Sequence, residues 1–463
     1  MSSNQTSAPY SAGKAWFVTW TLCFLYALSF VDRLVPSLLV QPITTHLHIS
    51  DGQMGAMFGA GFGVLYAIIA IPVAHLVDNH NRIRILSIGV LLWSICTIAS
   101  GFATSYWHLV ACRSGVAVGE AVLSPAAISL IGDMFIRQKR TLPTGLFMAT
   151  ASVSSGTFIV AGAAYRLSQN LASGGGMQPW QLTFMIVGLP GVILALLLLS
   201  AREPERIQQH DDQKQYATVA QAFAYIRSEK RLFGFLCLAM CVFTAPAYAV
   251  LSWAPTLLVR GYGMSPAEAG YTYGTTALIG VVGAIFWPSL AGYFLRRNQP
   301  SMIAVALAIG IPVGLIGMGL IGVASTVTGV LVAVAIFTLG GSSCYVLYAV
   351  IIQTVAPSNV RARLMAAMMG AGNLVGLVVG PSLAAWLANH YFSGPRAYGA
   401  AFSLIGFTAT PVVLILLLIA RGRFASAYKL AAESEARALS VLNAQRASMG
   451  TQGEMACQAD PAD

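Results

Sequence analysis

Four ionisable residues, Asp32, Arg33, Arg113 and Glu120, lie inside long apolar stretches of the sequence. A charged side chain in such a stretch is costly, and is therefore a candidate for function. If the stretches span a membrane as helices, counting from their polar ends places Asp32 and Arg113 both roughly 12 to 14 Å deep, so the two can pair. Glu120 follows Arg113 by two turns on the same helix face, roughly 10 Å deeper.

These residue types suit proton coupling. Burial disfavours the charged form of a carboxyl group, whereas an adjacent guanidinium favours it. A carboxylate that approaches and leaves an arginine can therefore take up and release a proton. We assign proton coupling to Asp32 and Glu120, and charge pairing or binding of a substrate head group to Arg33 and Arg113. The alternative is that all four form structural ion pairs that fix helix packing.

The composition shows which elements must position these residues. Apolar residues make up 57% of the 463 and charged residues only 9%, against about 25% charged in a soluble domain, which excludes a water-soluble globule. Lipid-exposed backbone must bond within helices, and the apolar runs lack strand-like alternation, so we expect an all-α polytopic membrane protein. Twelve stretches are long enough to cross a bilayer. They are 16–39, 54–77, 85–102, 107–134, 142–165, 182–200, 233–259, 266–295, 302–323, 327–355, 364–388 and 398–420.

The basic residues predict the orientation. The chain has 26 Lys and Arg against 16 Asp and Glu, and most of the cations fall in the terminal segments and the even-numbered connections. The odd-numbered connections hold only Arg166, Arg260 and Arg396. Cytoplasmic loops carry the excess of Lys and Arg, so both termini are expected in the cytoplasm. The net charge of +10 then follows from topology without a nucleic-acid partner.

The two halves of the sequence match by translation, which predicts a parallel repeat of two six-helix bundles with a cavity between them near mid-membrane. In the C-terminal tail we expect an interfacial helix over 424–442 and then disorder. The expected units are an N-terminal tail (1–15), a first bundle (16–200), a linker (201–231), a second bundle (232–420) and a C-terminal tail (421–463).

The connection after the second span carries Asp78 at a helix end, then Arg82 and Arg84. An acid followed by cations across a tight turn can hold neighbouring helix ends together in one state and release them in another. We therefore predict a cytoplasmic gate at these three residues. The alternative is plain positive-inside charge.

All four intramembrane charges lie in the first half, so the second half is expected to supply an apolar and aromatic cavity wall. Side chains of this kind more often pack inside the protein than contact a substrate. A glycine at every fourth position, Gly372, Gly376 and Gly380, indicates close helix packing. The candidate cavity residues are Tyr26, Phe243, Tyr248, Trp253, Tyr345, Tyr348 and Asn373.

Neither a metal site nor a catalytic site is expected. The sequence lacks clustered Cys and His spacings and a Walker-type glycine loop, and six of its seven cysteines fall inside apolar runs as small apolar fillers. No His, Asp and Ser constellation lies at membrane depth. We therefore expect no cofactor, no metal and no enzymatic activity, with the proton as coupling ion.

The gate residues carry a family resemblance. Asp78, Arg82 and Arg84 match the loop signature G-x-L-x-D-R-x-G-R-R of the major facilitator superfamily. The loop departs from the signature at Ala74, Asn79 and Asn81. Asn79 stands in place of an arginine, a departure that weakens the expected gate. Asn81 resembles the spinster-type branch, whose loop reads D-R-Y-N-R-K.

Three further segments resemble that branch. Residues 30–33 resemble its N-Y-x-D-R, residues 113–121 its R-x-x-x-G-x-G-E-A, and residues 253–255 its W-A-P. The resemblance implies the major facilitator fold and lipid export, with the matching Asp32 and Glu120 as protonation sites. Sphingolipids and lysophospholipids are the substrates associated with the branch.

The sequence thus predicts a secondary active transporter that works by alternating access, is coupled to protons and moves an amphipathic lysophospholipid-like or sphingoid-like molecule. The alternative is a proton-coupled carrier of small organic anions or drug-like compounds, held by Arg33 or Arg113. We expect a monomer in a lipid bilayer. Short outer loops without an Asn-x-Ser/Thr site fit a bacterial inner membrane.

Overall fold

A computed structural model describes residues 11–458, apart from 137–138, 153, 173–175, 205, 207–223 and 228. The described residues fold into helices joined by short connections. The first half comprises α1 (Ala12–Leu38), α2 (Val40–Leu47), α3 (Asp51–Ala56), η1 (Met57–Val64), α4 (Leu65–Asn79), α5 (Arg82–Ser100), α6 (Tyr106–Glu120), α7 (Leu123–Met134), α8 (Thr141–Ser152), η3 (Ser154–Gly156), α9 (Thr157–Ala172) and α10 (Pro179–Leu199). The second comprises η4 (Lys230–Gly234), α12 (Phe235–Tyr262), α13 (Pro266–Ala277), α14 (Ile279–Arg296), α15 (Ser301–Val323), α16 (Val327–Val355), α17 (Ser358–His390) and α18 (Ala397–Gln458).

Twelve membrane crossings account for these helices. Several crossings consist of two or three consecutive elements, such as α3, η1 and α4. Among the described residues, eleven helical runs are long and apolar enough to span a bilayer, and α8, η3 and α9 together form the remaining predicted crossing. The all-α, twelve-helix prediction is confirmed.

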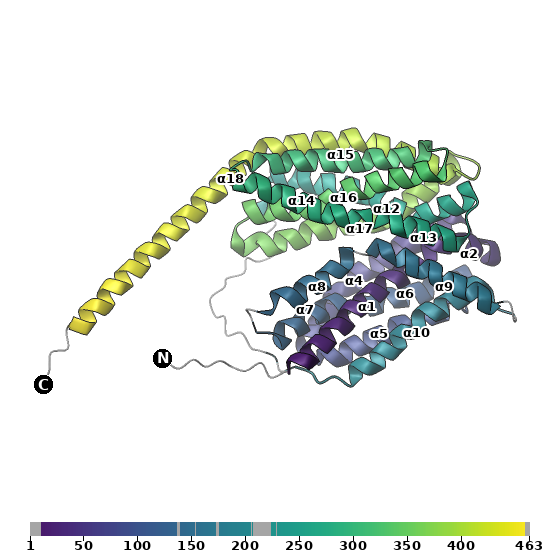
Figure 1. The fold of residues 1–463 in the computed structure, drawn as a ribbon, viewed down its shortest axis with the longest axis horizontal. Helices are drawn as coiled ribbons and strands as arrows, with labels where there is room; N and C mark the ends of the chain where they lie inside the picture. The colour runs from purple at the N-terminus through teal and green to yellow at the C-terminus, as the bar shows by residue number, and fades with distance from the viewer. Residues whose placement is uncertain are drawn as a thin grey trace.

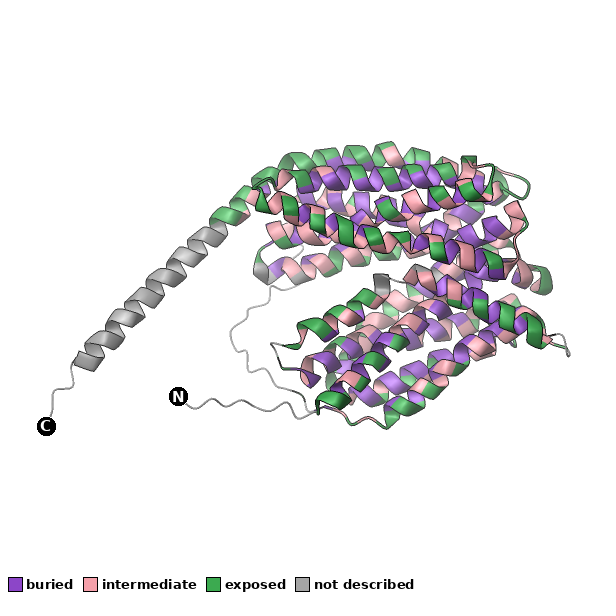
Figure 2. Ribbon diagram, viewed as in Figure 1, coloured by how far each residue is buried: buried purple, intermediate pink, exposed green. Residues whose placement is uncertain are grey.

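The two halves lie side by side and diverge toward one end of the molecule (Figure 1). At that end α1 begins and α18 leaves the bundle, so we call it the terminal side. The other end, near α2, is the far side, where the halves converge. Buried faces point into each half, and exposed faces point outward (Figure 2). The outward faces carry large apolar side chains such as Ile71, Trp107 and Ile285, as expected of helices in contact with lipid.

Glycines bring helix backbones together inside the second half and between the halves. A Cβ added at Gly380 would collide with the carbonyl oxygen of Ala245 on α12, and the Thr244 hydroxyl donates to the Gly372 carbonyl at 2.7 Å. The packing role predicted for this glycine series is confirmed. On the far side, a Cβ at Gly59 of η1 would lie 2.7 Å from the carbonyl oxygen of Val378 in α17, so the two halves meet there backbone to backbone.

The C-terminal tail differs from the prediction. Helix α18 continues without a break to Gln458, so the disorder expected after 442 is wrong. Residues 424–458 contain no proline, and so nothing in this stretch forces the helix to end. Most of the predicted linker and residues 1–10 lie outside the described residues.

Candidate functional site

An ion pair between α1 and α6 forms the centre of the site. The Arg33 guanidinium donates to Glu120 Oε2 at 2.6 Å, and the Glu120 side chain is 1% exposed. The Arg33 guanidinium also lies over the rings of Phe62 and Tyr66, with its central carbon 5.0 and 5.3 Å from their centroids. The cation is therefore held by a carboxylate and by aromatic faces together.

The sequence predicted charge pairing for Arg33 but did not identify Glu120 as its partner. Asp32 and Arg113 are both buried, but neither carboxylate oxygen of Asp32 has a hydrogen-bond partner among the described residues, and no ion pair joins them. The expected pair is wrong because equal depth does not fix direction: successive residues on a helix point about 100° apart. Glu120 is reached instead by the long side chain of Arg33.

A small cavity lies against this cluster, between the halves. Its volume is about 40 Å³, which accommodates a few water molecules and is too small for a lipid. The charged lining comes from the first half, through Arg33 and Arg113. The full lining is Arg33, Leu34, Ser37, Met57, Phe58, Phe62, Arg113, Tyr248, Leu251, Ser252 and Leu377.

Two of the candidate cavity residues form a polar contact in the second half, and a third lines the cavity. Tyr248 is among the lining residues. The Tyr345 hydroxyl donates to Asn373 Oδ1 at 3.2 Å, and Asn373 is exposed. Tyr26 stacks on Phe147, with centroids 4.6 Å apart, and does not line this cavity.

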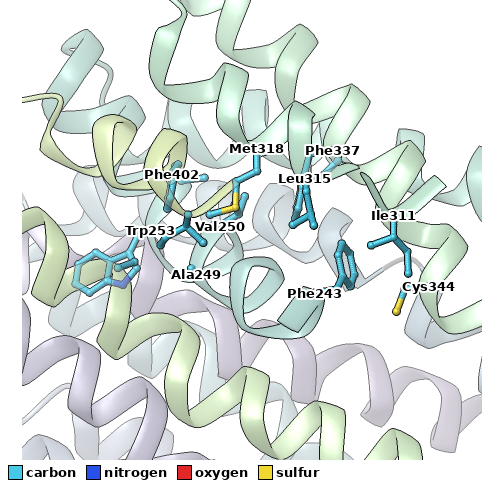
Figure 3. Close-up of a cluster of buried hydrophobic side chains, with 14 of the residues drawn as sticks. Phe243, Ala249, Val250, Trp253, Ile311, Leu315, Met318, Phe337, Cys344 and Phe402 are labelled. Atoms are coloured by element: carbon cyan, nitrogen blue, oxygen red, sulfur yellow. The ribbon is translucent and has the colours of Figure 1, made fainter. Parts of the chain in front are cut away.

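Three others are packing residues, so their prediction as cavity lining is wrong. Phe243 is buried beside Leu315 and Phe337 (Figure 3). Tyr348 is fully buried and donates to the Leu236 carbonyl at 2.6 Å. Trp253 is also fully buried. Its indole donates to the Pro381 carbonyl at 2.9 Å and stacks on Tyr398.

On the terminal side, Arg82 bonds to neighbouring segments of its own half. Its side chain is 1% exposed, pairs with Asp133 at the end of α7 and donates to Glu203 Oε1, just after α10, at 2.7 Å. Asp78 and Arg84 are exposed, and the described residues offer the Asp78 carboxylate no hydrogen bond or ion pair. Arg82 thus holds segments of its own half together through Asp133 and Glu203 rather than through Asp78. The cytoplasmic gate at Asp78, Arg82 and Arg84 stays a prediction.

On the far side, charged and polar residues join the two halves. Arg260, near the end of α12, donates to both Asp51 oxygens, at 2.5 and 2.9 Å, and to Gln41 Oε1 at 2.5 Å. The Tyr398 hydroxyl donates to Asp51 Oδ2 at 2.9 Å. We call Gln41, Asp51, Arg260 and Tyr398 the far gate. The sequence analysis missed it because residues at span ends look like ordinary loop charges.

Two six-helix halves, a buried charge cluster beside the cavity between them and an interface closed on one side define a membrane transporter. The Major Facilitator Superfamily model matches residues 22–378, and the chain belongs to this family. It covers 98% of a solved bacterial homologue of the human lysosomal transporter Spinster, in an inward-facing and unoccupied conformation, with a TM-score of 0.77. That match covers 90% of this chain at 23% identity.

Curated relatives are similar over part of their length. An MFS-type efflux pump of Mycolicibacterium smegmatis is 28% identical over 297 residues, 64% of this chain and 67% of the pump. Protein spinster of Drosophila melanogaster is 25% identical over 319 residues, 65% of this chain and 50% of that protein. The chain therefore spans about half to two thirds of these relatives, and within the superfamily it is similar to spinster proteins and to this efflux pump.

Proposed function

We propose that this transporter is coupled to protons and moves an amphipathic, lipid-like molecule of the lysophospholipid or sphingoid class. The observation that carries the proposal is the Arg33–Glu120 ion pair beside a cavity lined by both halves. Arg33 and Glu120 both belong to the first half, so the pair separates when the Arg33 side chain, which also lines the cavity, turns toward the cavity. Glu120 is then left as an uncompensated buried carboxylate, which favours proton uptake. The return of Arg33 expels the proton.

The direction of opening follows from the charges at the two ends. The terminal side carries most of the Lys and Arg, so we place it, and both termini, in the cytoplasm. The far gate then faces outward, and the described state is closed to the outside. We place the protein, as a monomer, in a bacterial inner membrane, with no cofactor besides the coupling proton.

The substrate class rests on the distribution of polarity. Arg33 and Arg113 offer cations to a polar head group, while Phe58, Tyr248 and Leu251 offer apolar and aromatic surface from both halves. An acyl chain that buries against such surface contributes about 0.8 kcal/mol per CH₂. Similarity to spinster proteins favours the same class.

Glu120→Gln tests the coupling. A side chain that is always neutral cannot cycle a proton, so the variant should fold and bind substrate but lose accumulation driven by an imposed pH gradient in proteoliposomes. Glu268→Gln, an acid in the capping box of α13 away from the cluster, is the control and should behave as wild type. Gradient-driven accumulation at the wild-type level in Glu120→Gln contradicts the assignment.

A second candidate function is transport of small organic anions or drug-like compounds. It is favoured by the two cavity-lining arginines and by similarity to an efflux pump. A binding series of lysophospholipids and sphingoid bases beside small carboxylates separates the two. Affinity that rises with chain length supports the lipid class, whereas tight binding of an anion without a tail supports the second.

A further inference from the structure

Asp32 is sealed away from the substrate cavity. It is fully buried and is not among the cavity-lining residues, although its chain neighbour Arg33 is. Trp93 and Thr97 of α5, one turn apart on the same helix face, lie near its carboxylate and act on it, but no hydrogen bond of good geometry joins them to it. The charged groups that act on Asp32 from α6 are Arg113 and Glu120.

Polar atoms on all sides of this compartment have no hydrogen-bond partner within the described part of the chain. They are both oxygens of Asp32, Nε1 of Trp93, Oγ1 of Thr97 and one terminal nitrogen of Arg113. The four residues are at most 2% exposed. A buried polar group without a partner costs about 1–3 kcal/mol. A cluster of five such atoms therefore requires an explanation.

The donors and acceptors are complementary. An indole N–H and a guanidinium only donate, a carboxylate only accepts, and a threonine hydroxyl does both. A buried water molecule makes two to four hydrogen bonds and is part of the structure where it does so. Water between these groups would satisfy each of them and would bond to the ionised form of Asp32.

Close helix packing holds the indole in place. A Cβ added at Gly119 of α6 would lie 2.8 Å from the Trp93 Cβ, so α5 and α6 approach each other there without an intervening side chain. The rotation of α5 that directs Trp93 and Thr97 toward Asp32 is therefore fixed by backbone contact.

We propose that Trp93 and Thr97 are positioning residues that, with bound water, hold the Asp32 carboxylate in a compartment separate from the substrate cavity. Arg113 stands between the two, because its charge acts on Asp32 and its side chain also lines the cavity. This inference rests on the proposed proton coupling. It implies that proton and substrate act on opposite sides of one guanidinium.

Thr97→Val and Trp93→Phe test the proposal, since each removes a hydrogen-bond donor. Thr97→Val keeps the shape of the side chain, whereas Trp93→Phe also replaces the buried indole by a smaller ring. Both should fold, and the pH at half-maximal transport in proteoliposomes should move upward by one unit or more because the charged carboxylate loses donors. Thr183→Val is the control: Thr183 is buried in the same half, and its hydroxyl bonds to Pro179 and Ser168. Its profile should match wild type. If Trp93→Phe does not fold, Thr97→Val suffices.

The outcomes separate this inference from the proposed function. Wild-type transport without pH dependence overturns both. Wild-type pH dependence that Asp32→Asn alters, while Thr97→Val and Trp93→Phe leave it unchanged, overturns only the positioning role. Independently of transport, a high-resolution map should show water density between Asp32 and Thr97, and a dry compartment overturns the inference.

Discussion

The far gate predicts that Asp51→Asn opens the protein to the far side. Asp51 accepts two hydrogen bonds from Arg260 and one from Tyr398, and all three join the first half to the second. A transporter that opens on the far side must break them. Weakening them therefore raises the population of the state that lacks them.

The magnitude follows from the number and exposure of these bonds. Hydrogen bonds to charged groups contribute about 1.5–3 kcal/mol, and asparagine keeps one acceptor oxygen but loses the charge. The Arg260 and Asp51 side chains are 23% and 13% exposed, so water screens part of the interaction. We expect a shift of about 1.5–2.5 kcal/mol, roughly a 10- to 70-fold change in the ratio of the two states.

Distances between spin labels on the two halves measure this ratio. In a background without native cysteines, one pair at Thr104 and Ser393 reports on the far side and another at Thr141 and Gln299 on the terminal side. Asp51→Asn should lengthen the first distance and shorten the second. Glu229→Gln, an acid that pairs with Arg423 within the second half, should change neither. Unchanged distributions in Asp51→Asn would refute the gating role.

Two further predictions concern stability. Arg82→Gln should lower the free energy of unfolding by about 3 kcal/mol or more, because it leaves Asp133 and Glu203 without their buried cation. Arg84→Gln, at an exposed position, should stay within about 0.5 kcal/mol of wild type. Equal melting temperatures for these two variants in detergent would contradict the stabilising role of the Arg82 ion pairs. Gly380→Ala should cost about 1–3 kcal/mol by overpacking α17 against α12. Gly370→Ala, where an added Cβ meets nothing within 4 Å, should not destabilise the protein, and similar losses in both would argue against the close contact.

The sequence predicted the crossings well because burial in lipid imposes one requirement on all of them. Apolar length alone determines where a crossing lies, so the expected 327–355 coincides with α16, and 107–134 differs from α6 and α7 by one residue at its start. The first crossing begins at Ala12 rather than at residue 16, because helices extend beyond the hydrocarbon into polar residues.

The ion pairs and the residues that line the cavity could not be predicted in this way, because they depend on helix rotation and side-chain rotamers. An aromatic residue in an apolar helix has the same sequence signature whether it packs, as Phe243 does, or faces a cavity, as Tyr248 does. One signal for the far gate was present. Arg260 is a cation on the side where the positive-inside rule does not require one, and an unexpected charge of that kind calls for a partner.

The contact between η1 and α17 has a consequence for leakage. A transporter that works by alternating access must not open to both sides at once. Under the proposed proton coupling, a chain of water molecules through a closed gate would dissipate the proton gradient as effectively as an open pore. Ion pairs hold surfaces together, but their bulky, hydrated groups leave gaps. At Gly59 the two backbones approach so closely that a single added carbon would lie 2.7 Å from a carbonyl oxygen. The far gate therefore holds the two halves together, and the backbone contact at Gly59 excludes water between them.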